Sequence, residues 1–297
     1  MPGLFFISSP LYIKFMKVIL ADVLGYCFGV RRAVDTALLT LEKNAGCPVY
    51  SLGPLIHNQS ALEMLGQKGL DVLNENEIDG IEPESCVIIR AHGVPPETLS
   101  ELEEKGCQVV NATCPKVVAS QKNAARYASM GYTVILAGDR NHGEVVGIAG
   151  YAGKKFILVE NCAEAEKVPS FPDDENAVLL SQTTFSREEF NGIAGILSGK
   201  IKNLKVMDTI CSATKERQDA LERLCPNADG ILVVGGKNSA NTKRLLQIAE
   251  NNCAAAALIE TAEEIPEAFF KLEKVGITAG ASTPDFVIQG VVKKLNS

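Results

Sequence analysis

VILADVLGYCFGVRRAV, residues 18–34, is the stretch that decides the fold of this chain. An apolar run with the character of a strand is followed by an Asp, a cysteine and then a helical pattern. The same order, with Asp or Asn before the cysteine, returns in residues 108–119, QVVNATCPKVVA, and in residues 205–217, KVMDTICSATKER. The cysteines of these segments hold one repeat position and divide the 297-residue chain into near-equal thirds. They are Cys27, Cys114 and Cys211.

Each third contains two more junctions between a strand and a loop, at similar distances from its cysteine. The first junction lies 28–30 residues after the cysteine, and the second lies 65–71 residues after it. With the cysteines, nine positions align, so we interpret the chain as three copies of one structural unit. The residues at the junctions are His57, His92, His142, Thr183, Ser239 and Ser282.

The local patterns predict that strands and helices alternate within each unit. Buried-strand patterns lie at residues 87–89, 134–136, 178–180 and 231–234, and helical patterns lie at residues 61–65 and 243–247. Such alternation predicts an α/β fold of three similar modules with short, mostly parallel sheets around a pseudo-threefold axis and a central cavity. Ligands of parallel sheets bind beyond the carboxyl ends of the strands, where all nine aligned positions fall.

The module boundaries are placed at or near the repeated cysteines. We interpret residues 1–15 as an N-terminal extension that precedes the first strand. Module 1 is expected to span residues 29–114, and module 2 residues 115–207. Module 3 is expected to combine residues 16–28 with residues 208–297.

Composition excludes several functional classes. A formal net charge of −7 without a cationic stripe argues against nucleic-acid binding, which needs clustered Lys and Arg. We found no apolar run of the length that a membrane span requires, and the N-terminus lacks the pattern of a signal peptide. The expected compartment is therefore the reducing cytoplasm.

Nine cysteines without any C-x-x-C spacing argue against a disulfide scaffold and against a zinc ribbon. Three thiolates from three modules can ligate one metal centre, and both zinc and an iron–sulfur cluster accept sulfur ligands. In a 4Fe–4S cluster with three cysteine ligands, one iron lacks a protein ligand and is open to substrate. The other cysteines are expected to be small buried hydrophobes: Cys47, Cys86, Cys107, Cys162, Cys225 and Cys253.

The chain has three histidines, and all of them fall at the repeated junctions or beside them. Imidazole N–H groups are suited to phosphate oxygens, and Ser239, Asn241 and Ser282 add hydroxyl and amide donors. Because these loops contain few basic residues, we expect a small anion held mainly by neutral donors. Glu144, two residues after His142, is a candidate proton donor, since burial beside a metal centre raises a carboxyl pKa.

As an ordered set, these motifs resemble the 4-hydroxy-3-methylbut-2-enyl diphosphate reductase family of the non-mevalonate isoprenoid pathway. The resemblance covers the chain from Met16 to its end. The matching motifs are residues 25–30 (GYCFGV), 56–58 (IHN), 90–94 (RAHGV), 112–115 (ATCP), 182–184 (QTT), 208–211 (DTIC), 236–239 (GKNS) and 279–282 (AGAS).

The resemblance implies one 4Fe–4S cluster on Cys27, Cys114 and Cys211, and removal of an allylic hydroxyl with two electrons and two protons. The implied products are isopentenyl and dimethylallyl diphosphate, and the implied electron donor is a ferredoxin or flavodoxin-type protein. Glu144, with Thr183 and His142, is implied in catalysis. The implied substrate-binding residues are His57, His92, His142, Thr183, Ser239, Ala240, Asn241 and Ser282.

Two positions depart from the family pattern. Gly143 stands where the family often has proline, which predicts a looser backbone before Glu144. Ala240 stands where the family often has serine, so only its backbone N–H is expected to contact a ligand.

Two alternative functions fit parts of the pattern. One is a zinc-dependent phosphohydrolase that uses the same thiolates, and the other is a non-catalytic phosphometabolite-binding protein. Neither alternative explains why a cysteine and two donor junctions recur in each third.

Overall fold

The computed structural model describes residues 16–297, and the predicted extension at residues 1–15 lies outside them. These residues form three four-stranded sheets in which every strand pair is parallel. The first sheet has the order β3 (Leu70–Leu73), β2 (Val49–Leu52), β4 (Cys86–Ile89), β5 (Gln108–Asn111). The second has the order β7 (Phe156–Val159), β6 (Thr133–Ala137), β8 (Asn176–Ser181), β9 (Asn203–Val206). The third has the order β1 (Lys17–Leu20), β12 (Lys274–Ala279), β10 (Gly230–Val234), β11 (Ala256–Ile259).

The predicted fold of three α/β modules is confirmed. The four predicted strands lie within β4, β6, β8 and β10. The two predicted helical stretches lie within α2 (Gln59–Gly66) and α9 (Ala240–Asn252). The other α-helices are α1 (Phe28–Lys43), α3 (Pro96–Glu104), α4 (Pro115–Ser129), α5 (Gly143–Tyr151), α6 (Cys162–Ala165), α7 (Arg187–Ser198), α8 (Ser212–Leu224) and α10 (Asp285–Leu295). Short 3₁₀ helices occupy η1 (Glu75–Gly80), η2 (Cys225–Asn227), η3 (Ala262–Glu264) and η4 (Glu267–Lys271).

Each sheet has an apolar core on both of its faces, because helices cover both faces. The central strands β4, β6 and β10 are therefore buried along their whole length. The edge strands β1, β5 and β9 contain only partly buried and exposed residues, since one side of each lacks a neighbouring strand.

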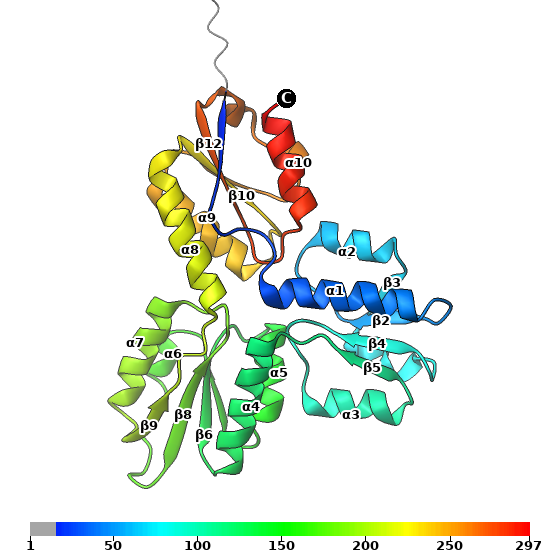
Figure 1. The fold of residues 1–297 in the computed structure, drawn as a ribbon. Helices are drawn as coiled ribbons and strands as arrows, with labels where there is room; N and C mark the ends of the chain where they lie inside the picture. The colour runs from blue at the N-terminus through cyan, green and yellow to red at the C-terminus, as the bar shows by residue number, and fades with distance from the viewer. Residues whose placement is uncertain (1–15) are drawn as a thin grey trace, which may run out of the picture.

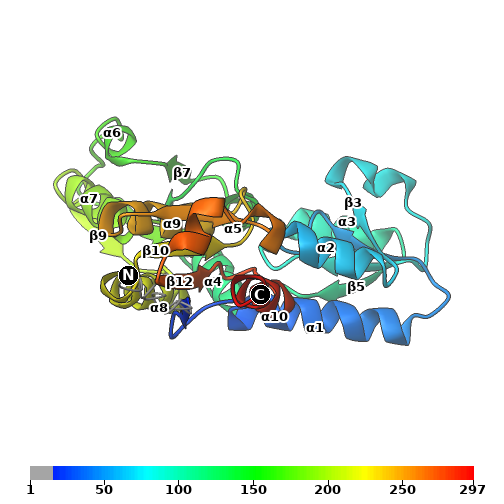
Figure 2. The same ribbon diagram turned by 90° about the horizontal axis from the view of Figure 1, so that it is seen from above.

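The three sheets appear as three lobes that meet where α1, α4 and α8 begin (Figure 1). Seen from above, the lobes lie side by side in one flat layer (Figure 2). Each of these helices packs on a different sheet from the strand that precedes it. Ala33 of α1, for example, packs with Ile88 of β4, whereas β1 pairs with β12. The cysteine between strand and helix is thereby placed at the junction of two modules.

Among residues 16–297, no helix combines the length and the apolar character that a membrane crossing requires.

Candidate functional site

One cavity of about 820 Å³, including its opening to solvent, lies where the three modules meet. Of the site residues predicted from the sequence, eleven line this cavity, and Ala240 begins α9 directly after one of them, Ser239. The predicted residues in the wall are Cys27, His57, His92, Cys114, His142, Glu144, Thr183, Cys211, Ser239, Asn241 and Ser282. The topology explains this convergence, because in each sheet the loops after three of the four strands lead to one of these residues.

Cysteines. Each cysteine precedes a helix as its N-cap residue, and the Val30 N–H approaches Cys27 Sγ at 3.5 Å. The backbone N–H of each cysteine donates to a carbonyl of the adjacent junction, at 2.8–3.0 Å. The three acceptors are the carbonyls of Ala91, Thr183 and Ala281. Because the same hydrogen bond occurs beyond an edge strand of each of the three sheets, the thiols are presented to the cavity in equivalent ways.

The thiols of different modules lie close enough to influence one another. Burial raises the pKa of Cys114, and the charges of Cys27 and Cys211 raise it further. The start of α1 approaches Cys114 so closely that a Cβ atom on Gly29 would lie 2.4 Å from the Cys114 sulfur. Three soft sulfur donors on one cavity wall fit zinc or an iron–sulfur cluster, and the absence of side-chain bulk at Gly29 leaves room at the sulfur.

Histidines. His57, His92 and His142 form a compact group on the cavity wall, with ring centroids 4.5–5.8 Å apart. Burial lowers the pKa of His57 and places the pKa of His92 well below its usual value. Burial also lowers the pKa of His142 to about 4, and the Arg90 guanidinium contributes to all three depressions. All three imidazoles are therefore neutral at pH 7, and each offers one N–H donor.

The tautomer of His142 is fixed by its neighbour. Its Nδ1 accepts the backbone N–H of Glu144 at 3.2 Å, so its proton resides on Nε2. Nitrogen atoms of the three rings lie within 4.8 Å of one another, a spacing that also suits a metal ion. A protonated Nε2 has no lone pair for a metal, so this tautomer favours an anion over a three-histidine metal site.

Glu144 is the candidate acid of the site. It is 1% exposed, yet its carboxyl group lines the cavity. The Thr183 backbone N–H donates to Oε1 at 2.6 Å, and the Thr183 hydroxyl donates to Oε2 at 2.7 Å. Burial raises the pKa of Glu144 to about 7, and the two Thr183 hydrogen bonds limit the rise. The carboxyl group is therefore poised to hold or release a proton near neutral pH. The two Thr183 hydrogen bonds fix the orientation of the Glu144 carboxyl group, although Gly143 precedes it.

Polar donors of module 3. Asn241 is 5% exposed, and neither its amide nitrogen nor its amide oxygen has a partner among residues 16–297. A buried amide without partners is costly, so this side chain is placed to bond a ligand in the cavity. Ser239 caps α9, whose N-terminus favours anions, and the Ser282 hydroxyl donates to the His57 carbonyl at 3.0 Å. Lys116 is the one cationic side chain among the described residues of the wall.

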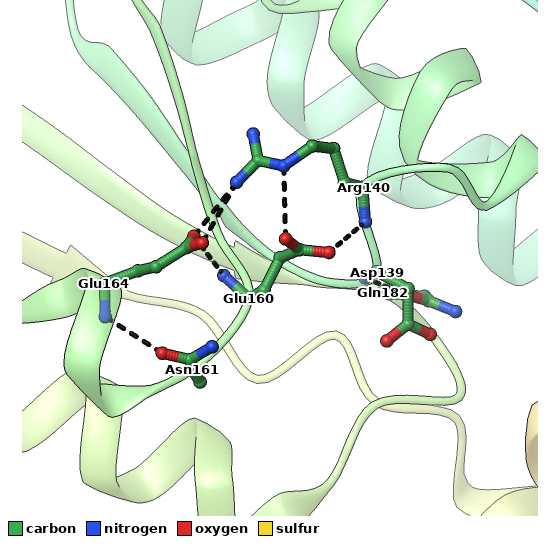
Figure 3. Close-up of polar contacts among 6 residues, drawn as sticks. All are labelled: Asp139, Arg140, Glu160, Asn161, Glu164 and Gln182. Atoms are coloured by element: carbon green, nitrogen blue, oxygen red, sulfur yellow. Dashed lines mark hydrogen bonds and ion pairs between the residues drawn. The ribbon is translucent and has the colours of Figure 1, made fainter.

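Loop support. The loop that carries His142 is held by a brace formed by Arg140, Glu160 and Glu164 (Figure 3). Glu160 accepts the Arg140 backbone N–H at 2.7 Å and the Arg140 Nε at 3.1 Å. Glu164 accepts the Arg140 Nη2 and, at 3.0 Å, the Glu160 backbone N–H. In the same view, Gln182 accepts the Asp139 backbone N–H at 2.8 Å. These contacts fix the backbone from which His142 and Glu144 project.

The same brace recurs in module 3 below the loop that carries Ser239. Glu260 accepts the Lys237 backbone N–H at 2.9 Å, and Glu264 accepts the Glu260 backbone N–H at 3.1 Å. Glu160 and Glu260 lie 46 and 49 residues after the cysteines of their thirds. They follow β7 and β11, and in these two sheets only the loops after β7 and β11 contribute no described residue to the cavity wall. Neither glutamate is among the residues predicted from the sequence, although their repeat spacing was a usable signal.

Arg90 and Gly143. Gly143, which departs from the family pattern, lies beside the Arg90 side chain. The Arg90 guanidinium lies between two glycines, and a Cβ atom on Gly143 would lie 3.2 Å from its Nη2. A Cβ atom on Gly53 would lie 2.4 Å from its Nη1. Arg90 is paired with Glu75 at 2.8 Å and sits behind the histidines. Arg90 belongs to one of the sequence motifs, but no role was predicted for it, since only the packing brings it to residue 143.

Remaining cysteines. The expectation for the other six cysteines is correct only in part. Cys86, Cys107 and Cys225 are buried, but Cys47 is exposed in the segment between α1 and β2. Cys162 and Cys253 are partly buried. Cys47 lies directly before Pro48 and outside the apolar runs, so it has no core to join.

Relatives. The model of the LytB protein family matches residues 18–296. The 4-hydroxy-3-methylbut-2-enyl diphosphate reductase of Treponema denticola is 48% identical over 288 residues, which cover 94% of this chain and 99% of the relative. The enzyme of the same name from Thermoanaerobacter sp. is 40% identical over 281 residues, which cover 94% of this chain and 96% of the relative.

Solved structures lead to the same group of proteins. The E-1-hydroxy-2-methyl-but-2-enyl-4-diphosphate reductase from Plasmodium falciparum superposes with a TM-score of 0.86 at 28% identity. The alignment covers 94% of this chain and 87% of that protein. An (E)-4-hydroxy-3-methyl-but-2-enyl diphosphate reductase, described as the terminal enzyme of the non-mevalonate pathway, superposes with a TM-score of 0.72 at 39% identity. That alignment covers 94% of this chain and 99% of that protein. With the family model matched along almost the whole chain, this protein belongs to the LytB family.

Proposed function

We propose that this protein reduces 4-hydroxy-3-methylbut-2-enyl diphosphate to isopentenyl diphosphate and dimethylallyl diphosphate, using a 4Fe–4S cluster. The observation that carries the proposal is the meeting, in one cavity, of three thiols, three neutral imidazoles and one buried carboxyl group. The names of relatives that are 40–48% identical support the same substrate and reaction.

Cys27, Cys114 and Cys211 are the residues that would hold the cluster. When bound, a 4Fe–4S cluster with three protein ligands supplies single electrons and an iron site open to substrate. No fourth cysteine lines the described part of the cavity wall, which is consistent with a three-ligand set.

The diphosphate end of the substrate is assigned to the neutral donors. His57 and His92 offer imidazole N–H groups, His142 offers its Nε2 proton, and Ser239 and Asn241 lie at the N-terminal end of α9. Hydrogen bonds from neutral groups to an anion are strong in a buried site because water competes poorly there. These contacts orient the allylic carbon chain toward the thiols.

Glu144 is assigned the proton that leaves with the substrate hydroxyl. The reaction takes up two electrons and two protons, breaks one C–O bond, forms one C–H bond and releases water. A carboxyl group with a pKa of about 7 is partly protonated at neutral pH, as a general acid requires. Thr183 holds both carboxyl oxygens in place for this transfer. The electrons are proposed to come from a ferredoxin or flavodoxin-type protein.

Anaerobic purification followed by iron, acid-labile sulfide and zinc analysis tests the proposal. We expect close to four irons and four sulfides per chain, and conversion of the allylic diphosphate to both products with a one-electron reductant. A colourless protein that contains zinc without sulfide would support the phosphohydrolase alternative instead. Diphosphate binding without turnover, unchanged when all three cysteines are replaced by serine, would support the binding-protein alternative.

A further inference from the structure

Arg217 of α8 is a buried cation behind the cysteine wall. It is 3% exposed, and none of the hydrogen bonds it makes in the described structure is to a carboxylate. Its Nη1 donates to the Ala213 carbonyl at 2.8 Å, and its Nη2 donates to the Gly25 carbonyl at 2.7 Å. Its Nε has no partner among residues 16–297. Burying a guanidinium group in this way is unfavourable unless a negative charge lies nearby.

The acidic groups that favour the Arg217 cation most are two thiols in their ionised form. Cys27 and Cys211 are the strongest favourable influences on its cation, ahead of Glu216. Glu216 is exposed, and consecutive residues of a helix do not face each other. The hydrogen bonds agree with this placement, because Gly25 lies two residues before Cys27 and Ala213 two residues after Cys211. Arg217 therefore links two of the three cysteine segments and places its charge beside both.

We propose that Arg217 is a positioning residue that fixes Cys27 relative to Cys211 and raises the reduction potential of the cluster that they bind. This inference rests on the proposed iron–sulfur function. Each electron that the cluster accepts adds negative charge, so a fixed cation in a buried setting stabilises the reduced state. Without that cation, the same one-electron donor transfers its electron less readily.

A redox titration of the anaerobically prepared protein tests the proposal, with Arg217→Gln, Arg217→Lys and a matched control. The control is Arg223→Gln, which removes the same charge from the exposed end of α8, where Arg223 faces Asp22. For Arg217→Gln we expect the equilibrium constant for one-electron reduction of the cluster to fall at least tenfold. That fall lowers the reduction potential by 59 mV or more. Arg217→Lys keeps the charge and is expected to stay near the wild-type potential, and so is Arg223→Gln.

Where Arg217→Gln fails to fold, Arg217→Met fills the same space without charge, and the same negative shift is expected. An unchanged potential in the neutral variants refutes the proposal. Equal shifts in Arg217→Lys and Arg217→Gln also refute it, because they indicate a packing role alone. Failure of the wild-type protein to bind iron and sulfide refutes the proposed function itself, so the two failures are distinguishable.

Discussion

Replacing Glu144 with glutamine removes a proton donor while preserving shape. The glutamine carbonyl can accept the Thr183 backbone N–H, and its amide can donate to the Thr183 hydroxyl, as a protonated carboxyl group does. We therefore expect Glu144→Gln to fold and to bind substrate. Turnover should fall by about 10² to 10⁴-fold, the usual contribution of a positioned general acid.

The same substitution makes a prediction about stability. Burial raises the pKa of Glu144 from 4.5 to about 7 in the folded protein, which at 1.36 kcal/mol per pH unit amounts to about 3 kcal/mol. The folded state holds this proton more tightly than the unfolded chain. The contribution of the group to stability is therefore fully present below pH 4.5 and is lost as the pH rises through 7. Glutamine does not titrate and lacks this pH-dependent loss.

Urea unfolding of wild type and Glu144→Gln at pH 5 and pH 8, at equal iron content, measures the difference. Relative to wild type, the variant should gain roughly 2 to 3 kcal/mol of stability between the two pH values. Glu103→Gln, the same chemical change on the exposed surface of α3, should show no such gain. A wild-type turnover rate, or a stability difference that does not vary with pH, would refute the assignment of Glu144 as a buried acid.

Three further predictions concern other parts of the site. Cys114→Ser should keep its far-ultraviolet circular dichroism but lose most of its iron and all turnover, and full iron retention would contradict the ligand assignment. Glu160→Gln should raise the KM for the diphosphate several-fold with a smaller effect on kcat, because the loop that carries His142 loses its brace; steady-state kinetics with unchanged KM would contradict this. Gly143→Ala should lower the free energy of unfolding by about 1 kcal/mol, since the new Cβ atom crowds Arg90, and an unchanged unfolding midpoint would exclude that crowding.

The repeat in the sequence was sufficient to predict the fold. Three copies of a strand, a cysteine and a helix specify three parallel sheets, because parallel pairing needs a helical crossover after each strand. Parallel strands also end at one edge of their sheet. His92 and Cys114 could therefore be placed at neighbouring strand ends from spacing alone, and the structure places them in one cavity wall.

The contacts that support the site could not be predicted from the sequence, because they join residues that are distant in the chain. Arg217 bonds the Gly25 carbonyl across 192 positions, and Arg90 meets Gly143 across a module boundary. Gly143 predicts a looser backbone before Glu144. The sequence did not indicate that Thr183 bonds both carboxyl oxygens of Glu144. Cys47 was expected inside and is exposed, since cysteine identity alone does not decide burial.

By itself, the sequence predicted which residues are candidates for the site and that they lie beyond strand ends, since periodicity and spacing are local properties of the chain. Only the tertiary structure decided their protonation. The histidines are neutral and Glu144 has a pKa of about 7 because the three modules bury these side chains where they meet. Desolvation depends on every atom packed around a group, and no segment of sequence contains that information.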